Sequence, residues 1–209
     1  MSGNLMTHRP TTTPRLRTLD DLRQRLGSVP PNRVRLTPMP GLATEKDVLT
    51  VYDREGRLCE LVDGVLVEKT VGYRESLLAC ALIAALEDFV TKRSLGLVSG
   101  EAGFLRLFPG LVRIPDVAFV SWNRLPGQKV PTEPIPELAP DLVVEILSQS
   151  NTAQEMARKR EEYFRAGVPL LWIVDPETRT VSVYTSPSES TVLDETQALD
   201  GGQALPGFT

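Results

Sequence analysis

Histidine is the scarcest reactive residue in this chain, with one example, His8, among 209 residues. It lies in a Thr- and Pro-rich stretch that predicts a flexible tail over residues 1–15. A Ser–His–Asp triad, a Cys–His pair or a His-rich zinc site therefore cannot be assembled. Any catalysis must rest on carboxylates, lysine, tyrosine, hydroxyls or a metal held by oxygen ligands, and oxygen-only sites suit Mg²⁺ or Mn²⁺.

Cysteines and long hydrophobic runs are also scarce. The two cysteines, Cys59 and Cys80, lack CxxC spacing and are expected to be reduced packing residues. No run approaches the roughly 18 apolar residues of a membrane helix, and the N-terminus lacks the apolar centre of a signal peptide. We therefore expect a soluble, cytoplasmic protein without membrane contact, in which residues 16–209 form a single domain.

Charge is unevenly distributed along the chain. The net charge is −4, which argues against a protein that coats nucleic acid constitutively. Residues 1–40 nevertheless carry seven Arg and two Asp, so they have a charge of +5, and the remainder has −9. This basic arm could contact phosphates, or it could be a solvated tail followed by a short surface helix.

Hydrophobic periodicity and turn residues predict an alternation of helices and strands. The predicted helices begin at Thr18, at Thr44, at Tyr73 and near Asn151, where Asn151 and Gln154 could form a capping box. The predicted strands form hairpins over 58–69 and 104–120, the first with a type I′ turn at Asp63-Gly64, and single strands over 142–147, 170–174 and 181–185. This order implies a mixed sheet flanked by helices.

One carboxylate interrupts the most apolar part of the chain. Glu145 lies within the run from Leu142 to Leu147, which is followed by a helix and then by a second apolar run, Leu170 to Val174. Strand, helix and strand at this spacing predict two buried neighbouring strands. An ionised glutamate there is costly unless a cation, a metal or several donors pair with it.

Asp116 and Lys159 are the residues expected to join Glu145. Asp116 follows Pro115 in a strand that the proline makes irregular. Neighbouring strands lie about 4.8 Å apart, so Asp116 and Glu145 can converge, whereas Asp141 lies about 13 Å from Glu145 along one strand. Lys159 is expected on or beside the apolar face of its helix, where it either reaches solvent or pairs with a buried anion.

These residue types suit metal-dependent phosphodiester hydrolysis. Two carboxylates can hold a hard cation that polarises the phosphate and acidifies a water, and a lysine can orient that water. Glu60, in the first predicted hairpin, is a third acid in a strand context. Each of the four residues also has a structural interpretation: an ion-paired strand residue for Glu145, a turn residue for Asp116, a solvent-facing strand residue for Glu60 and a snorkelling residue for Lys159. The combination of these residues favours a catalytic site over four separate structural roles. The few aromatic residues in the chain disfavour glycoside hydrolysis, which would need a sugar-binding platform.

Taken together, these motifs resemble the PD-(D/E)XK nuclease superfamily and, within it, the Uma-type branch of restriction endonuclease-like proteins. The resemblance covers about residues 41–207 and rests on ELVDGVLVEK, RIPDVAFV, APDLVVEILSQSN, Lys159-x3-Tyr163-x3-Gly167-Val168 and LLWIVDPETRTVSVY. It implies a restriction endonuclease-like α/β (α+β) fold, in which a mixed central β-sheet is flanked by helices. The nuclease core would span about residues 41–186, and homodimers would be in keeping with the family.

The same resemblance implies roles for particular residues. Asp116 and Glu145 would be metal ligands, and Glu60 would be an additional acid that assists as ligand or base. Lys159 would replace the superfamily's usual lysine, whose place is taken by Leu147. The implied activity is Mg²⁺-dependent endonucleolytic cleavage of DNA, with Mn²⁺ as a substitute. The alternative is a catalytically inactive module that keeps the nuclease fold for nucleic-acid binding or assembly, which the net charge and Leu147 favour.

Overall fold

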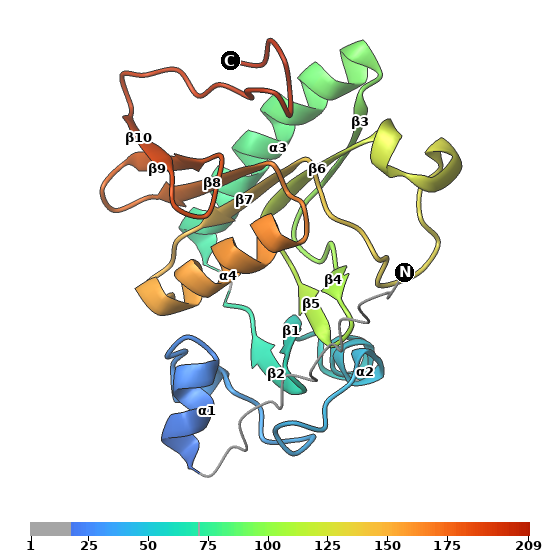
Figure 1. Ribbon diagram of the computed structural model, residues 1–209, viewed down its shortest axis with the longest axis vertical. Helices are drawn as coiled ribbons and strands as arrows, with labels where there is room; N and C mark the ends of the chain where they lie inside the picture. Colours follow the sequence, from blue (N-terminus) through green and yellow to red (C-terminus); the bar gives the residue numbers. More distant parts are fainter. Residues whose placement is uncertain (1–17, 71) are drawn as a thin grey trace, which may run out of the picture.

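The computed structural model describes residues 18–70 and 72–209, so the tail expected over residues 1–15, with His8, lies outside the described residues (Figure 1). The helices are α1 (Leu19–Arg25), η1 (Pro31–Arg33), α2 (Glu45–Glu55), α3 (Tyr73–Arg93), η2 (Trp122–Arg124), η3 (Pro126–Gln128) and α4 (Ala153–Arg165), where η marks a 3-10 helix. The strands are β1 (Cys59–Val62), β2 (Val65–Glu68), β3 (Gly96–Ser99), β4 (Leu105–Phe108), β5 (Leu111–Arg113), β6 (Val117–Ser121), β7 (Leu142–Ile146), β8 (Leu170–Asp175), β9 (Thr180–Tyr184) and β10 (Ser190–Asp194). Within the described residues, no helix is both long and apolar enough to cross a membrane.

The strands form two sheets. The larger sheet has the order β10-β9-β8-β7-β6-β3, and only β7 and β8 are parallel in it. The smaller sheet is antiparallel, with the order β2-β1-β5-β4. This arrangement agrees with the predicted α+β architecture of a mixed sheet flanked by helices. The expected strand over 111–120 is divided at Ile114-Pro115-Asp116, so that β5 belongs to the smaller sheet and β6 to the larger one.

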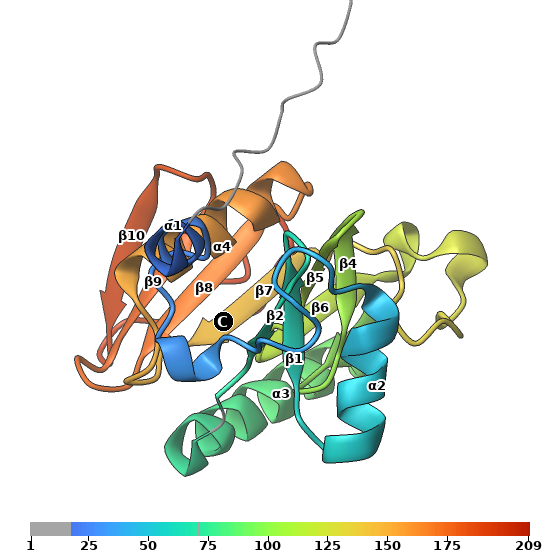
Figure 2. The same cartoon turned by 90° about the horizontal axis from the view of Figure 1, so that it is seen from below.

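Helices cover both faces of the larger sheet, α3 on one side and α4 on the other (Figure 2). Val144 of β7 packs in one hydrophobic cluster with Leu86 of α3. Val143 packs in another cluster with Tyr163 of α4. Because successive side chains of a strand point to opposite faces, Glu145 lies on the same face as Val143 and is directed toward α4. The parallel β7-α4-β8 unit confirms the strand-helix-strand prediction.

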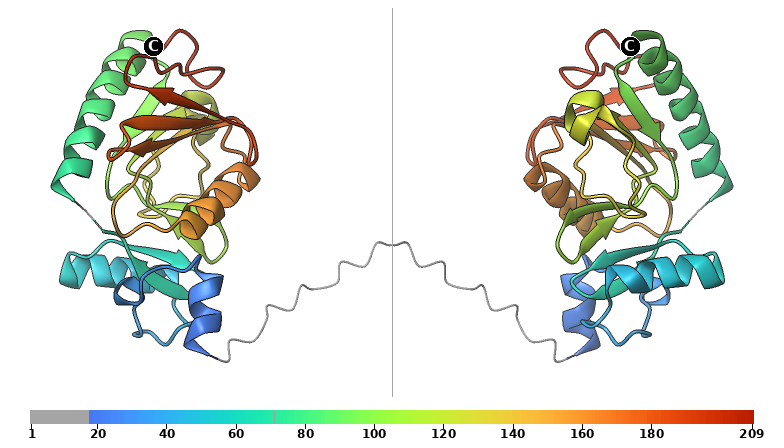
Figure 3. Two further views of the ribbon diagram at one scale, coloured as in Figure 1. Left: turned by 90° about the vertical axis from the view of Figure 1, so that its left-hand side faces the viewer. Right: turned by 90° about the vertical axis from the view of Figure 1, so that its right-hand side faces the viewer.

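The smaller sheet lies below the larger one and packs against α2 (Figure 3). Its hairpin turns at Asp63 and Gly64, whose φ angles of 52° and 75° confirm the predicted type I′ conformation. This turn lets β1 and β2 pair in full register, from Cys59 opposite Glu68 to Val62 opposite Val65. The hairpin thereby presents Glu60 toward the larger sheet and α4.

Some local predictions were wrong. The N-cap of α4 is Thr152, whose Oγ1 accepts from the Glu155 amide, because Asn151 instead accepts from the amide of Ser148. The sequence also predicted no strand where β10 lies, because this exposed edge strand lacks the apolar alternation that marks a half-buried strand.

Candidate active site

The structure brings the four predicted site residues into one charged cluster, where the smaller sheet meets the larger sheet and α4. Glu60 comes from β1, Asp116 immediately precedes β6, Glu145 lies on β7 and Lys159 on α4. Glu60, Glu145 and Lys159 are buried, with 1%, 4% and 3% of their surface exposed. A cluster of charges this deep must be internally paired to be tolerated.

Lys159 is held between two carboxylates. Its Nζ lies 3.0 Å from both oxygens of Glu145 and 3.1 Å from Oε1 of Glu60. Burial alone would lower the pKa of Lys159, but the charges of Glu145 and Glu60 raise it above its usual value. The lysine is therefore expected to stay protonated. Of the two alternatives that the sequence left open for it, the structure shows pairing with buried anions.

Glu145 has a second donor from the same helix. The hydroxyl of Tyr163, one turn after Lys159, donates to its Oε1 at 2.6 Å. Burial raises the pKa of this tyrosine well above its usual value, so the hydroxyl keeps its proton and remains a donor. Helix α4 thus fixes the carboxylate with two side chains spaced four residues apart on one face.

Asp116 is held against β7 next to Glu145. Its amide donates to the Val144 carbonyl at 3.1 Å, and its Oδ2 accepts from the Ile146 amide at 2.6 Å. Burial raises the pKa of Glu145, and the negative charge of Asp116 adds to this rise while Lys159 opposes it. The structure therefore brings together the two carboxylates that the sequence predicted to converge. With its side chain 16% exposed, Asp116 is nearer to solvent than Glu145.

The sequence interpretation missed Lys69, which directly follows β2. Its Nζ lies 2.8 Å from Oδ1 of Asp116 and donates to the carbonyl of Ile114 at 2.6 Å. The lysine closes the hairpin that carries Glu60, and its amide bonds to the Leu58 carbonyl. Its place at the end of the predicted hairpin was the one feature of the sequence that could have drawn attention to Lys69. Only the course of the chain between β5 and β6 reveals that Asp116 lies beside it.

Arg113 is a second residue that the sequence did not identify. Its Nη1 lies 2.7 Å from Oε2 of Glu60, while its Nε and Nη2 bond to Oε2 of Glu162 at 2.8 and 2.5 Å. Oε1 of Glu60 also accepts from the Ile114 amide at 3.2 Å. Although burial raises the pKa of Glu60, Lys159 and Arg113 hold it below its usual value. Glu60 is therefore ionised, with donors on both oxygens.

The cluster is neutral as a whole. Arg158 completes it by donating to Oε1 of Glu162 at 2.7 Å. Its four carboxylates and four cations are Glu60, Asp116, Glu145, Glu162, Lys69, Arg113, Arg158 and Lys159. This balance explains how an apolar strand accommodates Glu145, since each buried charge has a counter-ion and hydrogen-bond partners.

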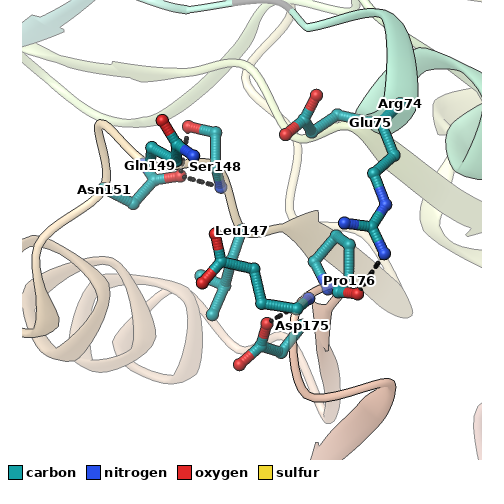
Figure 4. Close-up of a pocket in the computed structure, with 9 residues that line it drawn as sticks. Arg74, Glu75, Leu147, Ser148, Gln149, Asn151, Asp175 and Pro176 are labelled. Carbon is teal, nitrogen blue, oxygen red and sulfur yellow. Dashed lines mark hydrogen bonds between the residues drawn. The ribbon is translucent and has the colours of Figure 1, made fainter.

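A pocket of about 490 Å³ opens where β7 and β8 end (Figure 4). Leu147 and Ser148 form part of its lining, immediately after the residue that donates to Asp116. Opposite them, Arg74 at the start of α3 donates to the carbonyl of Pro176. The pocket does not reach the buried cluster itself. It opens beside Leu147, at the carboxyl end of β7.

Asp116 and Glu145 have the donor chemistry that Mg²⁺ requires. Among residues 18–70 and 72–209, no group of three or more His, Cys, Asp or Glu side chains is arranged to hold a metal ion. Mg²⁺, however, is usually held by one or two carboxylates together with waters and substrate phosphates. The carboxylates of Asp116, immediately before β6, and of Glu145 on β7 therefore fit this ion, with Lys69 and Lys159 as the cations in contact with them.

Together, the mixed sheet and its flanking helices place the protein in the restriction endonuclease-like class. The chain belongs to the Uma2 family, described as "Putative restriction endonuclease", whose family model matches residues 46–209. A solved structure with the same fold is a "putative nuclease belonging to DUF820" from Anabaena variabilis ATCC 29413, with a TM-score of 0.60 and 22% identity. That match covers 68% of this chain and 80% of the other. No curated protein is significantly similar. The resemblance expected from the sequence is thus confirmed.

Proposed function

We propose that this protein is a Mg²⁺-dependent endonuclease that hydrolyses phosphodiester bonds in DNA. The observation that carries the proposal is the convergence of Asp116, immediately before β6, and Glu145 on the neighbouring strand β7, each in contact with a lysine. Membership of a family described as restriction endonucleases supports the reaction class. Nucleases of this class generally use divalent metals, and Mn²⁺ is expected to substitute for Mg²⁺.

Asp116 and Glu145 would hold the metal ion. When bound, such an ion polarises the phosphate and lowers the pKa of a water. The lysine and tyrosine of α4 keep the Glu145 carboxylate in one orientation through three hydrogen bonds. Because Lys159 stays protonated, we assign it an electrostatic and orienting role in which it offsets the negative charge of the transition state.

We assign Glu60 to the positioning of Lys159 and not to base catalysis. Both of its oxygens already accept from donors, one from Arg113 and the other from Lys159 and a backbone amide. A carboxylate with this many contacts and a lowered pKa is a poor proton acceptor. Its negative charge instead holds Lys159 in the position that faces Glu145.

We assign Lys69 to substrate binding at the more exposed side of the site. Its partner Asp116 is the most exposed of the four predicted residues, with a side-chain exposure of 16%. The hydroxyls of Thr70, Ser148 and Ser150 form a hydrogen-bonded group next to it. An ammonium and several hydroxyls are groups that contact phosphate oxygens in nucleic-acid complexes.

The proposal is tested by incubating the protein with supercoiled plasmid, linear duplex, single-stranded DNA and RNA, with Mg²⁺, Mn²⁺ or chelator. We expect metal-dependent DNA cleavage that is lost in Asp116→Asn and retained in Asp88→Asn, an exposed aspartate paired with Lys92. Cleavage that persists in Asp116→Asn would indicate a contaminating nuclease. If no nucleic acid is cleaved, or if RNA alone is cleaved, the proposal is wrong, and binding without cleavage favours the inactive-module alternative.

A further inference from the structure

The chain that precedes the family-matching region is attached to α4 by a buried ion pair. Arg33 of η1 and Glu155 in the first turn of α4 have side-chain exposures of 4% and 2%. Nη1 and Nη2 of Arg33 lie 2.9 and 2.8 Å from the two oxygens of Glu155. This two-pronged geometry is specific to arginine, because a lysine can offer only a single point of charge.

Arg33 also connects α4 to the hairpin that carries Glu60. Its Nε donates to the Glu68 carbonyl at 2.8 Å, and its Nη1 to the Ser150 carbonyl at 3.2 Å. Glu68 is the last residue of β2 and directly precedes Lys69, while Ser150 lies in the loop that leads to α4. One guanidinium therefore fixes the spacing between the segment that bears Lys69 and the helix that bears Lys159.

The residues around Arg33 bind the same two elements. Gly27 has a φ of +81°, and a Cβ added to it would lie 2.7 Å from Cα of Glu155, so only glycine permits this close approach to α4. The carbonyl of Gly27 accepts from Oγ1 of Thr152 at 2.5 Å. On the other side, the Arg35 amide donates to the Leu66 carbonyl of β2 at 3.0 Å.

Two further ion pairs repeat this arrangement at the turn of the hairpin. Asp63, between β1 and β2, lies 3.0 Å from Arg25 of α1 and 3.0 Å from Arg158 of α4. Arg158 also donates to the carbonyl of Arg25. These contacts are more exposed than that of Arg33, so the buried Arg33–Glu155 pair is expected to contribute most of the specificity.

We propose that residues 18–35 act as a clamp that sets the position of α4 against the β1–β2 hairpin, and that Arg33 is its positioning residue. Lys159 follows Glu155 by four residues on α4, so both side chains lie on the same face of the helix. A shift of the first turn of α4 would carry Lys159 away from Glu60 and Glu145. The consequence for catalysis rests on the proposed function, whereas the placement of Lys159 does not.

Lysine labelling measures this placement without relying on activity. An amine-acylating reagent is applied briefly at neutral pH, and the modification of each lysine is quantified by mass spectrometry. The exposed Lys92 and Lys129 serve as internal references. In Arg33→Met and Glu155→Gln we expect labelling of Lys159 to rise about tenfold or more relative to these references, because either change leaves a buried charge without its partner. Arg35→Met is the matched control, since it removes surface pairs with Glu55 and Glu68 from the same segment without touching α4.

Hydrogen exchange of α3 distinguishes a local shift from general unfolding. We expect its core amides to remain as protected as in wild type in both variants. Unchanged labelling of Lys159 would overturn the proposal, and so would labelling that rises in step with exchange throughout α3.

If the wild-type protein cleaves DNA, kcat in Arg33→Met should fall by about a hundredfold with KM nearly unchanged, since the defect is misplacement of a group that acts on the transition state. A protein that cleaves nothing would refute the proposed function and leave the labelling result intact.

Discussion

Lys69 Nζ lies 2.8 Å from Asp116 Oδ1, so the carboxylate predicted as a metal ligand, which precedes β6 of the larger sheet, has a lysine partner that follows β2 of the smaller one. The Lys159–Glu145 contact lies deeper, with both side chains at most 5% exposed. The cluster therefore contains two lysine–carboxylate pairs at different depths. We expect the outer pair, Lys69 and Asp116, to contact substrate and metal. We expect the inner pair, Lys159 and Glu145, to fix the position of the Glu145 carboxylate.

Replacement of Lys69 tests the role of the outer pair. We expect Lys69→Met to lower the rate of DNA cleavage by about a hundredfold, because the phosphate and the transition state lose a nearby positive charge. Lys69→Arg keeps the charge and should recover part of the rate. Lys92→Met is the control, since Lys92 pairs with Asp88 on the exposed side of α3. Full activity in Lys69→Met would remove this lysine from the mechanism.

Replacement of Lys159 tests the inner pair through stability as well as activity. Lys159→Met leaves Glu60 and Glu145 buried without their shared cation, which typically costs about 3–5 kcal/mol of unfolding free energy. Adding Glu145→Gln removes one of the stranded charges, so the double variant should be more stable than Lys159→Met alone. Urea denaturation measures both values. Neither variant should cleave DNA.

A double variant that is no more stable than Lys159→Met would show that Glu145 does not depend on this lysine. Comparing the single and double variants is informative because Lys159 Nζ and the Glu145 carboxylate are in direct contact, at 3.0 Å. Coupling energies between residues are largest for such contacts.

The acid dependence of stability should differ between the two buried glutamates. The pKa of Glu60 is lowered in the folded protein by Lys159 and Arg113, which outweigh burial, so its stabilising contribution is present above its usual pKa of 4.5 and is lost as the pH falls below that value. The pKa of Glu145 is raised, chiefly by burial, so its contribution has the opposite sign and is lost as the pH rises through its folded pKa. Each proton changes the slope by at most about 1.4 kcal/mol per pH unit.

Urea unfolding at a series of pH values separates these two contributions. We expect Glu60→Gln to flatten the loss of stability below pH 4.5, and Glu145→Gln to remove a loss of stability that occurs above it. Parallel curves for wild type and both variants would contradict the assigned protonation of the cluster.

Local patterns sufficed for those parts of the site that one segment determines. Glu145 was identifiable because an apolar strand makes a charge conspicuous, and Lys159 because helical periodicity places it on the packed face. Lys69, Arg113 and Arg33 escaped prediction because their partners come from other sheets or from distant segments. No sequence spacing encodes those contacts.

Long-range pairing also explains the differences in the fold. Pro115 signalled an irregular strand, but the sequence alone did not reveal that the chain changes sheets there. β10 pairs with the edge of β9 although its own segment is largely polar and exposed.

Metal removal should leave the stability of the protein unchanged. The cluster contains four carboxylates and four cations, so it carries no net formal charge that a metal would have to balance. We therefore expect the thermal midpoint to be the same in chelator as in metal-free buffer. Mg²⁺ that binds the folded state should raise the midpoint with concentration, by linkage. This shift should be absent in Asp116→Asn and present in Asp88→Asn. A chelator that markedly lowers the midpoint would show that the metal has a structural role, and a Mg²⁺ shift that survives in Asp116→Asn would place the ion elsewhere.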